Sequence, residues 1–180
     1  MYSSRIFPTG PLCLWAWSLS SASAIASTAT IVNPTVTFSS YFGGNGDEYC
    51  SGIAVDDSGY VYIAAHTTSS NFPVKNAAYG YAMGYQDVTL TKLSPNCDSI
   101  IYSTYLGGRS SDVFPGLAVD RFGSVYLAGI TYSTNFPKVN AYDATLGGSC
   151  DVFITRFDND GTIAFSTYFG GSGEEEFGRI

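Results

Sequence analysis

A seven-residue pattern occurs three times in this 180-residue chain at almost constant spacing. It is Phe-Ser-Ser-Tyr-Phe-Gly-Gly at 38–44, Tyr-Ser-Thr-Tyr-Leu-Gly-Gly at 102–108 and Phe-Ser-Thr-Tyr-Phe-Gly-Gly at 165–171. The central tyrosines of the three copies lie 64 and 63 residues apart, and aligning 38–93 with 102–157 gives 23 identities in 56 positions. Self-similarity at a fixed period is typical of a duplicated structural unit that stacks on its neighbours.

Each unit is predicted to form four short β-strands. Asp57-Ser58-Gly59 between two apolar runs is typical of a hairpin turn, because Asp bonds the turn backbone and Gly adopts a positive φ. The strand after this turn alternates, with Val61 and Ile63 on one side and Tyr62 and Ala64 on the other. Aromatic residues make up 16% of the chain and charged residues 13%, which favours strands over disorder. The predicted strands are 52–56, 60–66, 87–93 and 100–106 in the first unit, and 116–120, 124–130, 151–157 and 162–169 in the second.

Four strands in each unit, with repeated glycine and aromatic positions, indicate the blades of a β-propeller. The units resemble the SBBP, or seven-bladed β-propeller, repeat family. The resemblance rests on Tyr-Ser-Thr-Tyr-Leu-Gly-Gly at 102–108, on Ile-Ala-Val-Asp followed by Gly-x-Val-Tyr at 53–62, and on Thr-x-Ser-x-Asn-Phe-Pro at 67–73 and 131–137. It implies a propeller in an exported protein and brings no catalytic residues with it.

The predicted fold is therefore all-β, a partial β-propeller with two complete four-stranded antiparallel blades. The repeats occupy 36–180, in units of about 38–101 and 102–164 and a partial unit at 165–180. Residues 36–42 match a fourth, outer strand, which in a whole ring could complete the last blade. Because closed rings contain about four to eight blades, we expect further repeats of the same kind in a longer chain.

The first 26 residues are predicted to be a signal peptide. Arg5 precedes a short apolar run, and Ala-x-Ala sites end at Ala24 and Ala26. The run is too short for a transmembrane span, so we expect a secreted or cell-surface protein with a linker at 27–35. Cleavage would also remove Cys13 and leave Cys50, Cys97 and Cys150, of which at least one must stay unpaired.

The loops on one rim of the blades are the candidate binding site. The first kind of loop, 43–51 and 107–115, is acidic, and the second, 67–86 and 131–150, is long and carries Asn-Phe-Pro. In both units we expect the Asn-Phe-Pro phenylalanine to plug the interface between blades. The acidic residues form either a solvated surface or a Ca²⁺ site, since Ca²⁺ prefers oxygen ligands. The candidate residues are Asp47, Glu48, Asn71, Phe72, Asp112, Asn135, Phe136, Glu174 and Glu175.

Other titratable residues are predicted to be structural. His66, the single histidine, ends a strand and corresponds to Ile130 in the second unit. Asp56 and Asp120 lie at the opposite rim as turn residues. We expect the aspartates that open the third strand of each unit, Asp87 and Asp151, to order the preceding loop by accepting hydrogen bonds.

These features favour a non-catalytic, exported scaffold that binds a protein or a glycan, with no cofactor apart from the possible Ca²⁺. The formal charge of −7 disfavours nucleic acid as a partner. The alternative is a fragment of a secreted propeller enzyme that uses paired carboxylates on polysaccharide.

Overall fold

The computed structural model describes residue 36 and residues 38–176, so the predicted leader and linker lie outside the described part. The described residues form eight β-strands and none of their segments is a helix that could cross a membrane. The strands are β1 (Glu48–Val55), β2 (Val61–Thr67), β3 (Asp87–Leu93), β4 (Ile100–Leu106), β5 (Asp112–Val119), β6 (Val125–Thr131), β7 (Asp151–Phe157) and β8 (Ile163–Phe169).

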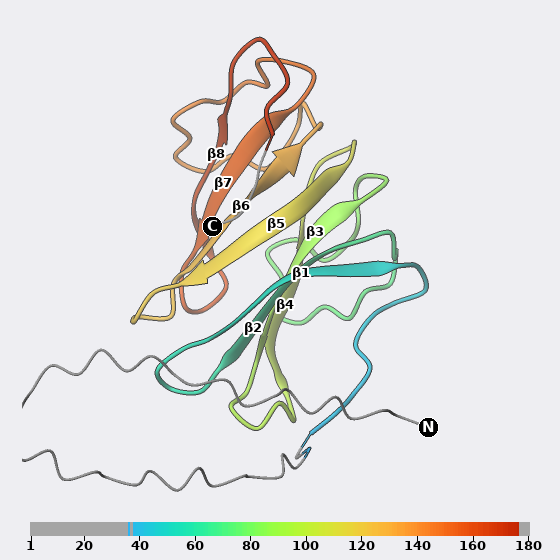
Figure 1. The fold of residues 1–180 in the computed structure, drawn as a ribbon, viewed down its shortest axis with the longest axis vertical. Helices are drawn as coiled ribbons and strands as arrows, with labels where there is room; N and C mark the ends of the chain where they lie inside the picture. The colour runs from blue at the N-terminus through green and yellow to red at the C-terminus, as the bar shows by residue number, and fades with distance from the viewer. Residues whose placement is uncertain (1–35, 37, 177–180) are drawn as a thin grey trace, which may run out of the picture. The chain divides into compact units, whose positions relative to one another are not determined.

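Each predicted set of four strands forms one antiparallel sheet. Blade 1 has the strand order β1-β2-β3-β4 and blade 2 the order β5-β6-β7-β8. β5, the innermost strand of blade 2, lies against β1, β2 and β3 (Figure 1). The hairpin turns form as expected, with Gly59 and Gly123 at φ of 84° and 79°. The all-β fold of a partial propeller is thus confirmed.

The first strand of each blade begins earlier than the sequence predicts. β1 starts at Glu48 and β5 at Asp112, where loops are expected, and each strand contains an irregularity, at Cys50/Gly52 and at Val113/Gly116 respectively. An extra residue in one strand breaks the period-2 alternation of side chains. A pattern search therefore detects only the part of the strand beyond the irregularity.

The two faces of a blade have different roles. We call the forward face the side of a sheet that points toward the next blade, and the rear face the opposite side. The main core is formed where the forward face of blade 1 packs on the rear face of blade 2. The forward face contributes Tyr62, Ala64, Val88, Leu90, Tyr102 and Leu106, and the rear face contributes Val125, Leu127, Phe136, Phe153, Phe157 and Tyr168.

The long loops between the second and third strands cover the outer edge of each blade. Lys75 pairs with Ser103 of β4, and the Tyr105 N–H donates to the Tyr79 carbonyl at 3.1 Å. In blade 2, Val139 pairs in the same way with Ser166 of β8. These contacts satisfy backbone groups that an unprotected edge strand would leave open. The length of the loops thus reflects an edge pairing that the sequence pattern does not reveal.

Residues 38–42 form no strand, in contrast to the outer strand predicted at 36–42. The described residues offer this segment no neighbouring strand with which to form a ladder. Its Phe42 ring nevertheless meets Phe72 edge-to-face, with ring centroids 5.1 Å apart. Phe42 corresponds in the repeat to Leu106, which is buried in the same core cluster as Phe136. The segment therefore lies where the end of a preceding fourth strand would be.

Candidate functional site

The acidic rim residues hold the glycine pairs of the repeat in place. Glu48, Asp112 and Glu175 are equivalent positions, and each carboxylate accepts the N–H of the second glycine. The N···O distances are 3.2 Å from Gly44, 2.7 Å from Gly108 and 2.9 Å from Gly171. The same interaction in three successive units indicates that these carboxylates order the rim.

Serine and asparagine of the long loops bind the same rim segment. Asn71 Oδ1 accepts the Asn45 N–H at 2.7 Å, and Asn135 Oδ1 accepts the Arg109 N–H at 2.8 Å. Ser133 Oγ accepts the Ser110 N–H at 2.9 Å and donates to Asp112 at 2.9 Å. Ser69 makes the equivalent pair of bonds in blade 1, to the Gly46 N–H and to Glu48. The hydrogen-bonding capacity of these side chains is thus largely used by contacts within the fold.

The phenylalanine of Asn-Phe-Pro packs over its own sheet. Phe136 is fully buried and stacks on Phe153 with centroids 4.7 Å apart, while Phe72 is 5% exposed. The Tyr168 hydroxyl donates to the Ser133 carbonyl at 2.6 Å and accepts the Phe136 N–H at 3.0 Å. Tyr105 makes the same two bonds in blade 1. The repeated tyrosine and the Asn-Phe-Pro motif thus form one locking element.

Asp87 and Asp151 order the ends of the long loops, as predicted. Asp87 accepts the Met83 N–H at 2.7 Å, and Asp151 accepts the Gly147 N–H at 2.9 Å. Both side chains are buried, and burial raises the pKa of Asp87. Asp56 and Asp120 likewise accept the N–H groups of their own turns, which agrees with the turn role predicted for them.

The equivalent carboxylates Glu48 and Asp112 differ in their electrostatic environment. Burial raises the pKa of Asp112 to about 6, although hydrogen bonds from Thr131, Gly108 and Ser133 favour the charged form. Burial also acts on Glu48, but hydrogen bonds from Ser69, Thr67 and Gly44 outweigh it and lower the pKa. Asp112 is fully buried, whereas Glu48 is only partly covered. The amount of burial decides the direction of the shift.

The remaining predicted acidic residues are more open. Asp47 is exposed and contacts Thr68 through its backbone, and Glu174 is exposed and accepts the Ser149 hydroxyl at 3.2 Å. Within residues 38–176 no group of three or more His, Cys, Asp or Glu side chains lies close enough to hold a metal ion. Cys50, Cys97 and Cys150 are all free thiols.

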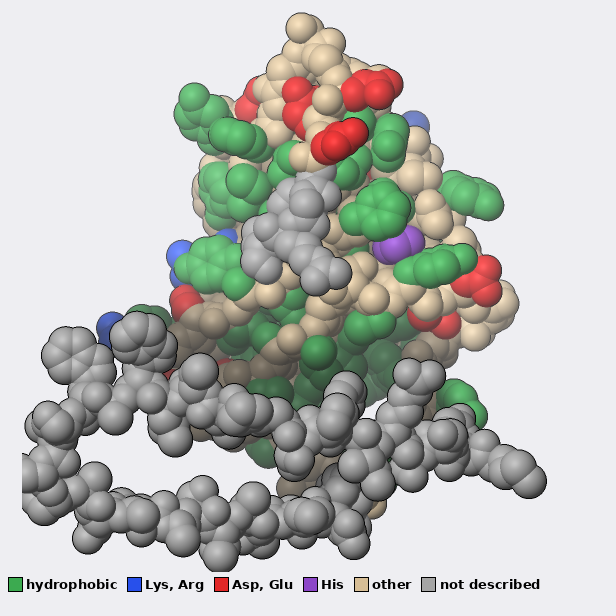
Figure 2. Space-filling model, in the orientation of Figure 1, with side chains coloured by type: hydrophobic (Ala, Val, Ile, Leu, Met, Phe, Trp, Pro, Cys, Tyr) green, Lys and Arg blue, Asp and Glu red, His purple; other side chains and the backbone are tan. Residues whose placement is uncertain are grey.

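An aromatic cluster on this rim has no counterpart in the predicted site. His66 is buried against the half-exposed Tyr49 ring, which stacks on it at 4.9 Å, and the Phe114 ring meets His66 edge-to-face at 5.3 Å. Figure 2 shows the histidine in purple with hydrophobic side chains in green on both sides. Burial lowers the pKa of His66. We call these three residues the aromatic patch.

The aromatic patch occurs in one unit only. The corresponding residues are Val113 for Tyr49, Ile130 for His66 and Cys50 for Phe114. Phe114 also has a φ of 55°, which is uncommon for a bulky residue and often accompanies a functional surface. The break in the repeat at these three positions was the sequence signal that could have identified the patch.

Two segments of the chain, residues 37–73 and 101–137, match the family model described as SBBP, beta-propeller repeat. The two matches include the rim glycines and the Asn-Phe-Pro motifs described above. No curated protein matches the chain.

Proposed function

The chain carries two SBBP beta-propeller repeats, and on this basis we propose that it is a non-catalytic scaffold that presents the aromatic patch to a protein or glycan partner. The observation that carries this proposal is a difference between the polar and the aromatic side chains of the rim. Polar side chains are used in the same way in successive units to hold the loops, whereas the patch interrupts the repeat and remains accessible.

The patch has the chemistry of a recognition surface. Tyr49 is 49% exposed and Phe114 60% exposed, so each presents part of a ring to solvent. Aromatic rings bury a large area at a small cost in side-chain entropy, which favours them at binding surfaces. Stacking on His66 limits the rotation of Tyr49 before a partner arrives. A sugar ring or an apolar peptide side chain could bind the exposed rings.

Binding can be tested with a glycan array and a pull-down using the purified chain. We expect Tyr49→Ala and Phe114→Ala to remove the binding that the native chain shows. Phe122→Ala is the matched control, because Phe122 is an exposed aromatic residue in the turn at the opposite rim. Binding that survives both patch substitutions, or that is lost in the control, would contradict this assignment.

We also propose export through the leader at 1–26, to the cell surface or the medium. The layout of Arg5, the apolar run and Ala24 and Ala26 supports it. N-terminal sequencing of protein recovered outside the cell should begin at Ile25 or Ser27. Material that begins at Met1 would contradict the proposal.

The alternative of a polysaccharide-cleaving enzyme receives no specific support from the described residues. Glycoside hydrolysis needs a pair of carboxyl groups that can reach the substrate. Asp87, Asp112 and Asp151 are buried and accept hydrogen bonds from loops. A carboxylate pair in the aromatic patch would have favoured the enzyme, but the patch contains His66 and two aromatic rings.

A further inference from the structure

The Tyr49 ring of the aromatic patch has one covered face and one open face. His66 stacks on this ring with an interplanar angle of 13° and a centroid distance of 4.9 Å, so the imidazole covers one face. The Tyr49 side chain is nevertheless 49% exposed, which leaves the opposite face to solvent. The face of an aromatic ring carries partial negative charge and attracts cations within about 6 Å of its centre. The open face of Tyr49 therefore favours a positively charged ligand group.

The chain places its own cations over aromatic rings elsewhere. Lys92 Nζ lies 4.5 Å from the ring centroid of Tyr60, and the guanidinium carbon of Arg121 lies 4.7 Å from that of Phe122. Among residues 38–176, no lysine or arginine lies over either exposed ring of the aromatic patch. These two rings are therefore free to receive a cation from another molecule.

An exposed carboxylate lies near Tyr49 on the same rim. Asp47 extends the pairing of β1 with β2, since its carbonyl accepts the Thr68 N–H at 3.0 Å and its own N–H donates to the Thr68 hydroxyl at 2.8 Å. Two residues of extended chain span about 7 Å, so Asp47 lies this close to Tyr49. This separation is shorter than the screening length of about 8 Å in physiological salt. Asp47 therefore adds to the attraction of a cation toward the ring.

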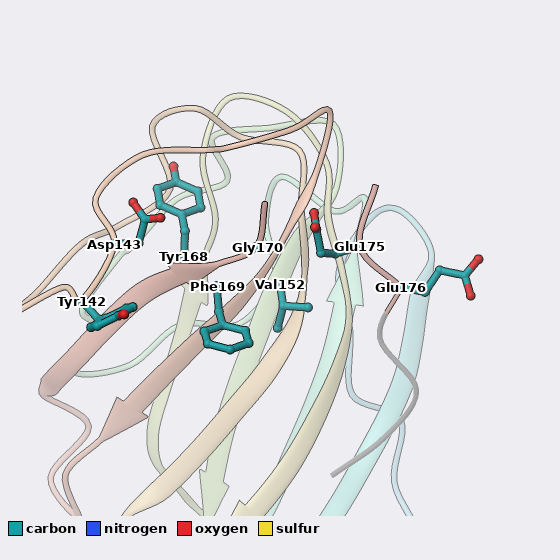
Figure 3. A pocket seen from close by; sticks show the side chains of 8 residues that line it. All are labelled: Tyr142, Asp143, Val152, Tyr168, Phe169, Gly170, Glu175 and Glu176. Carbon is teal, nitrogen blue, oxygen red and sulfur yellow. The ribbon is translucent and has the colours of Figure 1, made fainter. Parts of the chain in front are cut away.

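The whole rim around the patch is acidic. Arg109 is the single cation of its three equivalent segments, 43–49, 107–113 and 170–176. The same segments contain Asp47, Glu48, Asp112, Glu174, Glu175 and Glu176. Figure 3 shows the exposed Glu176 with its carboxylate pointing away from the other labelled side chains. A surface of this charge raises the local concentration of cationic partners and speeds their encounter with the rim.

We propose that the aromatic patch binds an arginine side chain in a basic segment of a protein partner. This inference rests on the proposed function and selects a cationic protein over a glycan. A guanidinium group is planar, so it stacks on the open face of Tyr49 while its N–H groups remain available to a neighbouring carboxylate. A neutral sugar would also stack on the ring, but it would gain nothing from the acidic rim.

The covered face of the Tyr49 ring supports the same contact. His66 lies on this face and is buried, and burial lowers its pKa. The imidazole is therefore neutral at neutral pH and adds no positive charge that would repel a guanidinium group. The stack also holds the tyrosine ring in one orientation, so less side-chain entropy is lost when a partner binds.

Two peptides that differ only in charge test the proposal. The probes are Gly-Arg-Gly-Arg-Gly and the same peptide with citrulline, the uncharged isostere of arginine, in place of both arginines. Each peptide is titrated into the purified chain and followed through the NMR signals of the Tyr49 ring. We expect the citrulline peptide to bind at least about tenfold more weakly than the arginine peptide. Binding of the arginine peptide should also weaken as the salt concentration rises.

Variants separate the contribution of the ring from that of the charge. Tyr49→Leu should weaken binding of the arginine peptide about fivefold, and Tyr49→Phe, which keeps the ring face, should restore most of this loss. Asp47→Asn should weaken binding about two- to threefold and reduce its dependence on salt. Phe122→Leu is the matched control and should bind like the native chain, because this ring lies at the opposite rim and already carries Arg121. Circular dichroism checks that each variant keeps its β-structure.

The proposal is overturned if the two peptides bind equally, or if Tyr49→Leu binds the arginine peptide like the native chain. The glycan array separates this failure from a failure of the proposed function. A sugar whose binding depends on Tyr49, together with an arginine peptide that does not bind, overturns the arginine proposal and leaves the patch as a glycan site. If Tyr49→Ala changes nothing in the array, the pull-down and the peptide titration, the proposed function is contradicted as well.

Discussion

Blade 1 and blade 2 are built from the same repeat, yet equivalent positions differ in burial. Tyr62 and Leu106 are fully buried in blade 1, while their equivalents Tyr126 and Phe169 in blade 2 are exposed. The rear faces show the reverse, since Leu127 is buried and Ile63 only partly so. Both faces of a blade thus carry apolar side chains, and a face becomes part of the core when a neighbouring blade covers it.

The largest predicted difference in stability between the two blades concerns the Asn-Phe-Pro phenylalanines. Phe136→Ala should destabilise the protein by about 3–5 kcal/mol, because it empties a fully buried site beside Phe153. Phe72→Ala should cost clearly less, since Phe72 is covered mainly by Tyr105 and the unpaired segment around Phe42. Urea unfolding of both variants measures the difference. Equal losses would show that the open end of blade 1 is packed as tightly as the internal junction.

The pH dependence of stability should separate Asp112 from Glu48. The pKa of Asp112 in the folded protein, about 6, lies above its ordinary value of 3.8, so its contribution is present in acid and is lost as pH rises through about 6. Relative to Asp112→Asn, the native chain should lose up to about 3 kcal/mol of stability between pH 4 and pH 8.

The contribution of Glu48 to stability should depend on pH in the opposite direction. Its pKa is lowered, so its contribution is present above the ordinary value of 4.5 and is lost as pH falls. Thermal unfolding of Asp112→Asn and Glu48→Gln across this range compares the two sites. The same slope for both variants would contradict the opposite directions in which the pKa values of Asp112 and Glu48 are shifted.

The locking element of the repeated tyrosine and the Asn-Phe-Pro motif should contribute equally to stability in the two blades. Tyr105→Phe and Tyr168→Phe each remove a buried hydroxyl that makes two backbone hydrogen bonds, and each should cost about 1–3 kcal/mol. The two losses should agree because the lock lies within a blade and does not depend on a neighbour. Denaturant midpoints provide the measurement, and a large inequality would mean that the lock is coupled to the blade junction.

The smallest effect is predicted for the cations at the blade edges. Lys92 is buried over the rings of Tyr60 and Tyr62 and bonds to Asn159, so Lys92→Ala should cost about 1–2 kcal/mol. Arg156 forms an open ion pair with Asp158 at 2.9 Å, and Arg156→Ala should change stability by less than about 0.5 kcal/mol. A larger loss of stability for Arg156→Ala in dilute protein would contradict the exposure of Arg156 on the forward face of blade 2.

Local signals in the sequence anticipated much of this structure. The strand sides at Tyr62 and Ile63, the turns at Gly59 and Gly123, and the loop-ordering role of Asp87 are confirmed, because each depends on neighbours close along the chain. The start of β5 at Asp112 was missed because a bulge interrupts the alternation. The role of the long loops as edge covers was also missed, because it joins Lys75 to Ser103 across the blade.

The candidate site shows the same difference between what a local motif predicts and what only the tertiary structure reveals. Asn71 and Phe72 were selected from their motif, and only the structure reveals that they hold the rim and the sheet together. Tyr49 and His66 are paired across β1 and β2, whereas the contact of Phe114 with His66 depends on where β5 packs against blade 1.

The sequence by itself determined the repeat length, the four-stranded unit and the aspartates that order each long loop, because short-range hydrogen bonding and side-chain periodicity are properties of a local segment. Only the tertiary structure decided which face of each blade is buried, which carboxylate has a raised pKa and which aromatic residues meet. These depend on the surface that tertiary packing removes from water, and two similar local patterns can differ in that surface.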